Sequence, residues 1–194
     1  VLLPSGTGKV AFATSVISYF SMFAQLGIPT YGIRACAQVR DDKYKLSKVV
    51  HELCIINFIM MLLSYLVFFG GIVFVERLRN EKILFVIMGS MILFNSIGME
   101  WLYKALEEYT YITIRSIVFK AIAVSMVLIV VKSQGDYVIY GAISIFAASA
   151  SNVMNCINAH KYITLKPIEN YNFRQHIKPI LIFFGMSCAT TIYT

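Results

Sequence analysis

Glu100 is the acidic residue whose position in the sequence carries the most chemical meaning. It lies in an apolar stretch, directly before Trp101. An ionised side chain at the centre of a membrane helix costs about 2.5–3.5 kcal/mol on insertion scales, and such groups usually face a polar interior. Lys104 follows four residues later, so both side chains share a helix face in the favourable orientation. The pattern fits an interfacial ion pair in an aromatic belt and a cavity-lining carboxylate equally well.

Three basic side chains are candidates for contact with an anionic ligand. Arg34 ends the first apolar block, where an arginine can snorkel to lipid headgroups or offer its planar fork to a phosphate, and snorkelling is the favoured interpretation. Arg115 begins the fourth block and is expected at the membrane interface. Lys120 lies deeper in the same block and needs an aqueous cavity, a partner or a snorkelling path. Lys120 is therefore the strongest physical candidate for an anionic substrate.

A stripe of small polar residues runs through the fifth apolar block. Its members are Ser149, Ser151, Asn152, Asn155 and Asn158. Side chains of this kind hydrogen-bond neighbouring membrane helices together more often than they line a substrate path. We therefore expect the stripe to join helices.

No pattern in the sequence predicts catalysis, a metal site or a cofactor. The four cysteines are far apart, which indicates packing inside helices rather than metal binding or disulfides. His51 and Glu52 lack zinc-site spacing and are expected at a polar helix end. Residues 6–9 (GTGK) are not a phosphate-binding loop, because Leu3 stands where the pattern requires glycine. We expect a protein that is not an enzyme and has no metal or cofactor.

The composition indicates a membrane protein. Hydrophobic residues make up 58% of the 194 residues and charged residues 14%, and the mean hydropathy is +0.71, whereas soluble domains have about 45–50% apolar and 25% charged residues. A chain of this size cannot hide that excess in one water-soluble core. Lipid permits only helices and closed barrels, and the alternation of barrel strands is absent. The predicted fold class is an all-α, polytopic transmembrane helical bundle.

Six apolar blocks are the candidate membrane spans. Each complete block has about the 20 residues that a spanning helix needs. Pro29, after Gly27, is expected to kink the first block near one end. The blocks cover residues 10–33, 49–75, 83–103, 111–131, 137–158 and 177–194, the last of them cut short.

The basic residues predict the orientation in the membrane. Alternate connecting segments belong to one side, and residues 34–48, 104–115 and 161–178 together hold eleven of the 17 Lys and Arg residues, against five on the other side. Cytoplasmic loops carry such an excess, so these segments are expected in the cytoplasm. The net charge of +7 reflects the same bias and does not indicate nucleic-acid binding, because the sequence has no basic patch interleaved with aromatic residues.

Several stretches together resemble one family, the bacterial polysaccharide repeat-unit flippases. These belong to the polysaccharide transporter branch of the multidrug/oligosaccharidyl-lipid/polysaccharide exporter superfamily. The resemblance covers essentially the whole chain in order. The stretches are residues 18–20 (SYF), 26–34 (LGIPTYGIR), 39–43 (VRDDK), 46–48 (LSK), 100–107 (EWLYKALE), 111–116 (YITIRS) and 176–180 (HIKPI).

The resemblance implies a fold, a function and partners. It implies about six helices of the N-terminal lobe of a two-lobe exporter, a fragment without the first helix and the second lobe. Such exporters flip undecaprenyl-pyrophosphate-linked oligosaccharides for O-antigen or capsule assembly across the bacterial cytoplasmic membrane. Partners would be this lipid-linked substrate, the bilayer, a glycan polymerase and other assembly proteins. Arg34, Lys120 and Arg115 would contact pyrophosphate or acidic sugar, and Glu100 would be a cavity wall or coupling carboxylate.

Three other functions compete with this interpretation. A cation-coupled drug exporter of the same superfamily would favour carboxylates over Arg and Lys in its cavity. A membrane-embedded glycan polymerase or glycosyltransferase would need a large extramembrane loop with catalytic carboxylates, and this stretch has none. A non-transporting scaffold would have little use for charged residues inside the membrane.

Overall fold

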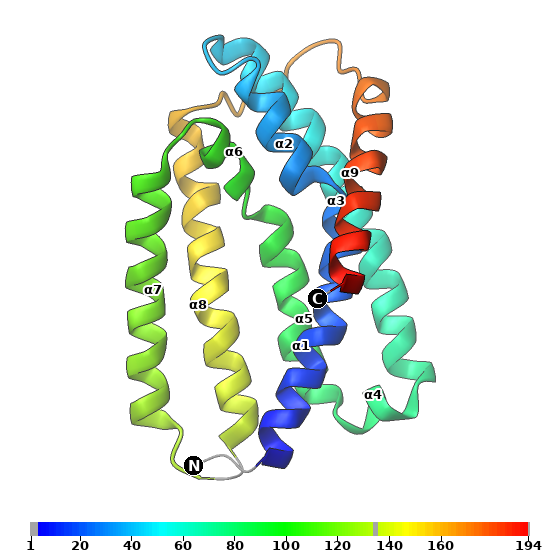
Figure 1. Ribbon diagram of the computed structural model, residues 1–194, viewed down its shortest axis with the longest axis vertical. Coiled ribbons are helices and arrows are strands. Elements are labelled where there is room, and N and C mark those ends of the chain that lie inside the picture. Colours follow the sequence, from blue (N-terminus) through cyan, green and yellow to red (C-terminus); the bar gives the residue numbers. More distant parts are fainter. Residues whose placement is uncertain (1–3, 134–135, 194) are drawn as a thin grey trace.

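The long apolar blocks fold into helices because a helix satisfies every backbone hydrogen bond within one segment. The computed structural model describes residues 4–133 and 136–193, and within them it is all-helical, with 84% helix and no strands. Most long helices run side by side in a bundle (Figure 1). The elements are α1 (Pro4–Gln25), α2 (Ile28–Ala37), α3 (Lys43–Phe74), α4 (Glu76–Asn80), α5 (Lys82–Ile97), α6 (Glu100–Ala105), α7 (Tyr109–Val130), α8 (Tyr137–Asn158), the short 3₁₀ helix η2 (Ala159–Lys161) and α9 (Arg174–Tyr193).

Five segments of the described chain are long and apolar enough to cross a membrane. They are Thr7–Ala37, Lys43–Phe74, Lys82–Ala105, Tyr109–Val130 and Tyr137–Lys161. They correspond to the first five predicted blocks, with α3 starting six residues before its block and α8 matching its block. The sixth predicted segment is helical as α9 but is not among the five, and its first turns carry Arg174 and Lys178.

Two of the spans are broken rather than continuous. The expected kink near Pro29 is a full break, in which Leu26 has a φ of 47° and α2 starts at Ile28. Proline is tolerated there because the first turn of a helix has no acceptor for its missing N–H. A second break, which the sequence did not predict, lies at Met99, whose φ is 41°. The two short helices after the breaks, α2 and α6, pack against each other.

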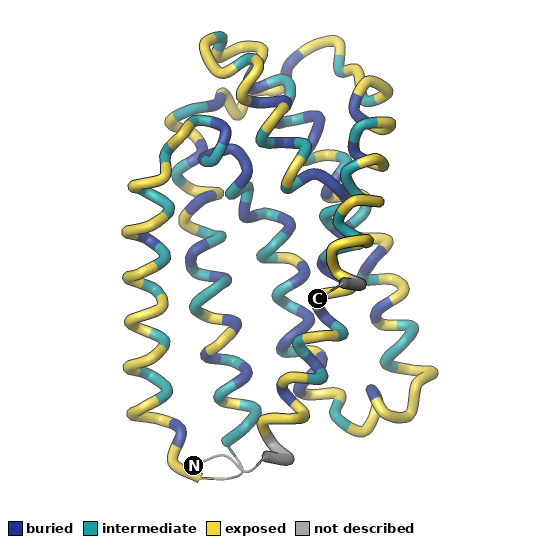
Figure 2. Tube along the Cα trace, viewed as in Figure 1, coloured by how far each residue is buried: buried dark blue, intermediate teal, exposed yellow. Residues whose placement is uncertain are grey.

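The outer surface of the bundle is apolar, and polar groups lie inside. Figure 2 shows α7 exposed along most of its length, with Ile117, Val124 and Leu128 pointing outward. In contrast, Glu52, Asn57 and Arg115 are buried. A soluble protein has the opposite arrangement, so the exposed apolar faces are those that lipid would cover. The fold is that of a multi-pass membrane protein.

The connecting segments that the sequence placed on one side lie at one end of the bundle (Figure 1). Arg40, after α2, donates to Glu107, after α6, at 2.8 Å. The N–H of Thr164, after α8, donates to the hydroxyl of Ser47 at 2.9 Å. The three basic connections therefore contact one another at this end of the bundle.

Candidate functional site

Three neighbouring cavities inside the bundle share polar lining residues. We call the first the break cavity (about 210 Å³), because both helix breaks line it. The second is the cationic cavity (about 490 Å³), between α7 and α8. The third is the α1 cavity (about 300 Å³), lined by Ser18, Ser21 and Gln25. Asn95 lines all three, so the cavities adjoin one another.

The break cavity exists because two helices are interrupted at the same level. Ile28 and Pro29 line it from the first break, and Gly98 and Met99 line it from the second. Irregular backbone at membrane depth is tolerated only where protein buries it or where it lines a water-filled cavity. Discontinuous helices of this kind form substrate and ion sites in membrane transporters. The break cavity is therefore a candidate binding site.

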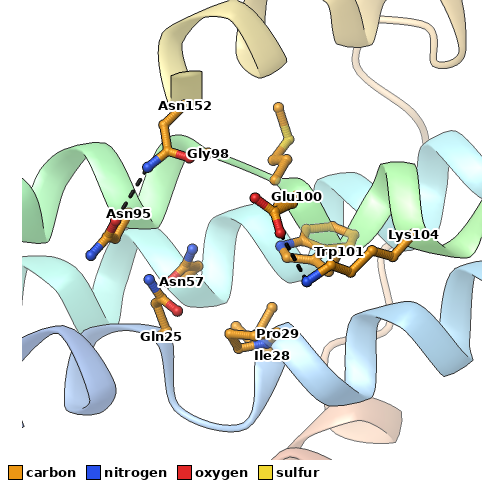
Figure 3. Close-up of a pocket in the computed structure, with 11 residues that line it drawn as sticks. Gln25, Ile28, Pro29, Asn57, Asn95, Gly98, Glu100, Trp101, Lys104 and Asn152 are labelled. Carbon is orange, nitrogen blue, oxygen red and sulfur yellow. Dashed lines mark hydrogen bonds and ion pairs between the residues drawn. The ribbon is translucent and has the colours of Figure 1, made fainter. Parts of the chain in front are cut away.

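Glu100 lies where the break cavity and the cationic cavity meet. Its carboxylate is 2.8 Å from Lys104 Nζ, as the four-residue spacing predicted, and 3.3 Å from Arg115 Nη2. Figure 3 shows Glu100 pointing toward Lys104 within the cavity. The ion pair and the cavity-lining position, which were alternatives in the sequence, both occur.

The sequence placed Arg115 at the membrane interface, and the structure buries its side chain among protein partners. Only 6% of it is exposed. Its guanidinium donates to the side-chain oxygen of Asn155 and to Glu100, and it lies 5.7 Å from the ring centre of Tyr111. The bundle offers these partners, so the side chain turns inward. Its Nε is buried and has no partner among the described residues.

Lys120 lines the cationic cavity together with Ser116 and Ser144. Although Lys120 and Arg115 are five residues apart and were not expected on one stripe, the cavity is wide enough for both. Arg34 and Lys120 are both exposed, but Arg34, on α2, is not among the residues that line the three cavities. The structure brings three of the four predicted site residues together and leaves Arg34 apart.

The asparagine stripe of α8 joins helices, as its spacing predicted. Asn152 donates to Asn95 of α5 at 3.2 Å. Asn155 accepts from Arg115 of α7 through its side chain and from the Tyr103 hydroxyl through its backbone carbonyl. Asn152 also lines two of the cavities, so one residue both joins helices and faces the polar region.

Three carboxamides at the site were not singled out from the sequence. Gln25, Asn57 and Asn95 all line the break cavity. The sequence could have marked them as candidates, because an amide inside an otherwise apolar membrane block is costly unless it forms hydrogen bonds. What the sequence lacked was any indication that these separate blocks bring their amides together.

A second polar cluster corrects the prediction that Glu52 lies at a polar helix end. Glu52 is fully buried on α3. Its carboxylate accepts from the N–H of Asn172 at 2.6 Å and from the Gln175 amide at 3.0 Å, and it lies 2.6 Å from Nε2 of His176. The first turn of α9 folds over α3 and removes Glu52 from solvent.

In the described residues, no group of three or more His, Cys, Asp and Glu side chains could hold a metal ion.

Comparison with known proteins gives one match. A family model described as "Polysaccharide biosynthesis protein" matches residues 1–194. Neither the curated proteins nor the solved structures gave a match. The family match spans all the helices and cavities described above.

Proposed function

This chain belongs to the polysaccharide biosynthesis protein family, and from that membership and the cavity chemistry we propose that it exports lipid-linked oligosaccharides. The substrate would be an undecaprenyl-pyrophosphate-linked repeat unit, flipped across the bacterial cytoplasmic membrane for surface glycan assembly. The family and the membrane-helical fold fit a transporter better than an enzyme.

The observation that carries the proposal is a polar, positively charged pair of cavities in an otherwise apolar bundle. Arg115, Lys120 and Lys104 line the two adjoining cavities, against the single carboxylate of Glu100. An intramembrane charge is costly and usually marks a substrate path. A headgroup that carries phosphate and many hydroxyls needs a hydrated, cationic path through hydrocarbon, and this lining supplies one.

The sign of the charge distinguishes the proposal from the closest alternative. An exporter of organic cations would favour carboxylates in its cavity, because opposite charges attract the ligand. Here Glu100 is held by Lys104 and Arg115, so it is not free to bind a cationic drug. Arg34 would act separately, as an exposed phosphate contact on α2.

The proposal is tested by deleting the gene in the cells from which it comes and restoring variants on a plasmid. The deletion strain should lose surface glycan and accumulate lipid-linked oligosaccharide. Lys120→Met should export about tenfold less than the intact protein at equal protein level, which is the loss of one charge-assisted contact. Lys120→Arg should keep most activity, and Lys166→Met, an exposed position outside the cavities, should be unchanged. Arg34→Ala tests the contact on α2 in the same strain.

Two results would overturn the proposal. Unchanged surface glycan in the deletion strain would remove the export function. Increased sensitivity of the same strain to small toxic molecules would favour the small-molecule exporter.

A further inference from the structure

We propose that the break cavity binds the hydroxyl groups of one sugar ring of the substrate, while Arg115 and Lys120 in the cationic cavity take its negative charge. This inference rests on the export function proposed above and adds a carbohydrate subsite with named residues. It divides the polar region into the break cavity, where carboxamides predominate, and the cationic cavity.

Carboxamides from four helices line the break cavity, beside one ion pair. Gln25 belongs to α1, Asn57 to α3, Asn95 to α5 and Asn152 to α8, and they converge on the break cavity (Figure 3). A carboxamide offers both donors and an acceptor, and a hydroxyl group is likewise both donor and acceptor. A ring of carboxamides therefore matches a sugar better than it matches a purely anionic or purely cationic group.

Asn57 provides the independent evidence for a ligand. Its Nδ2 donates to the backbone carbonyl of Ser96 at 2.7 Å, and this bond fixes the orientation of the amide. The side-chain oxygen is left without a partner among the described residues, although Asn57 is only 4% exposed. Buried polar atoms in native proteins are nearly always hydrogen-bonded. An acceptor that is buried, oriented and unpaired in a polar cavity is the complement of a hydroxyl donor.

Trp101 adds an apolar surface to the same cavity. A sugar ring presents C–H faces as well as hydroxyl edges, so a site for one ring needs both kinds of surface. Gly32 allows the indole to sit close to α2, because a side chain there would approach the ring to within 2.8 Å. The cavity volume of about 210 Å³ is below the roughly 300–1,000 Å³ of typical small-molecule pockets, which suits one ring rather than a whole oligosaccharide.

A metal cation fits this cavity less well. The one carboxylate in the lining, Glu100, is already paired with Lys104 and Arg115. Hard cations take six to eight close oxygen ligands, usually including unpaired carboxylates. The four carboxamides instead bring as many donor groups as acceptors.

Trp101 also makes the inference measurable, because it is the only tryptophan in the chain. The purified protein is titrated with two probes while Trp101 fluorescence is recorded. One probe is the lipid-linked oligosaccharide that accumulates in the deletion strain, and the other is the free oligosaccharide released from it by mild acid. Asn57→Leu and Gln25→Met remove cavity carboxamides, and Gln38→Met makes the same change at an exposed site outside the cavity.

The inference predicts that the free oligosaccharide changes Trp101 fluorescence saturably. Its apparent Kd should rise about tenfold in Gln25→Met and in Asn57→Leu, and stay unchanged in Gln38→Met. Within the described part of the chain, the Gln25 side chain has no hydrogen bond to lose, so its variant remains informative if Asn57→Leu fails to fold.

Other outcomes overturn the inference and separate it from the export function. Equal binding of the lipid-linked probe by all variants, with no response to the free oligosaccharide, would remove the sugar subsite and leave the exporter intact. A fluorescence response to sodium chloride, matched against choline chloride, with none to sugar would replace the sugar by a cation. No response to either oligosaccharide would count against both proposals.

Discussion

Nε2 of His176 lies 2.6 Å from a carboxylate oxygen of Glu52, although 124 residues separate them in the chain. The other ring nitrogen of His176 lies 2.8 Å from the hydroxyl of Tyr31. The Tyr31–His176–Glu52 cluster therefore joins α2, α3 and α9 at the end of the bundle that carries the basic connections. Because Glu52 is fully buried, the cluster fixes the position of α9 on the rest of the bundle.

Breaking this cluster should destabilise the protein strongly. Removal of one partner from a buried pair leaves the other uncompensated and costs about 3–5 kcal/mol, so Glu52→Ala should lower the thermal unfolding midpoint in detergent by several degrees. Glu107→Ala, which breaks the exposed pair with Arg40, is the matched control and should change it little. Equal midpoints for the two variants would show that the cluster does not hold α9.

Gly27 allows α9 to cross the first helix break at close range. A Cβ on Gly27 would lie 2.6 Å from the backbone nitrogen of Phe184 and against the carbonyl of Ile180. Backbone cannot move aside as a flexible side chain can, so Gly27→Ala should displace α9 and lower the unfolding midpoint. Gly185→Ala, where a Cβ meets open space, should be neutral or slightly stabilising. A neutral Gly27→Ala would contradict the close crossing.

Gly98 should matter for export more than for folding. A Cβ there would lie 2.6 Å from Cγ of Asn152, so Gly98→Ala should push Asn152 away from Asn95 and into the break cavity. We expect reduced export at near-normal protein level in the complementation strain. Gly8→Ala, which has open space around its Cβ, serves as the control. Normal export by Gly98→Ala would mean that the cavity tolerates the displaced amide.

Arg115 and Glu100 should be energetically coupled. Contacting residues in one network typically show interaction energies of 0.5–3 kcal/mol, and Arg115 is buried while its carboxylate partner is 3.3 Å away. In a double-mutant cycle with Arg115→Met and Glu100→Gln, the double variant should be more stable than the sum of the single losses predicts. The measurement is the free energy of unfolding in mixed detergent. A stability loss in the double variant equal to the sum of the two single losses would exclude the coupling.

The start of α3 should respond to acid through Asp42. Its carboxylate accepts from the backbone N–H groups of Lys45 and Tyr44, and chiefly the Lys45 bonds lower the pKa of Asp42 below its usual 3.8. A lowered carboxyl pKa adds stability that is complete above the ordinary value and is lost as pH falls through the folded value. Asp42→Asn keeps a capping side chain without the titration. The stability difference between wild type and Asp42→Asn should therefore shrink as the pH falls below the usual carboxyl pKa of 3.8. A constant difference would contradict the assignment.

The sequence was informative about elements and local pairs. Long apolar blocks predicted α7 and α8 closely, because a membrane span needs a minimum apolar length that composition alone reveals. The Glu100–Lys104 pair followed from helix periodicity. The interruption near Pro29 was predictable, because proline has a fixed φ and no backbone N–H to donate.

The break at Met99 carried no such signal. Methionine is neither a helix breaker nor a residue that favours positive φ, so its conformation is imposed by the packing of α6 on α2 and by the close approach of Asn152 to Gly98. The inward turn of Arg115 has the same origin, since its partners come from α6 and α8.

By itself the sequence therefore determined that the chain is helical, spans a membrane and carries scattered polar residues in its spans. Only the tertiary structure decided that Gln25, Asn57, Asn95 and Asn152 line one cavity and that Glu52 is buried under α9. The physical reason is the distance along the chain over which each property is set. Hydropathy and helix periodicity are properties of neighbouring residues, whereas a cavity depends on how separate helices are rotated and broken against one another, which no single block encodes.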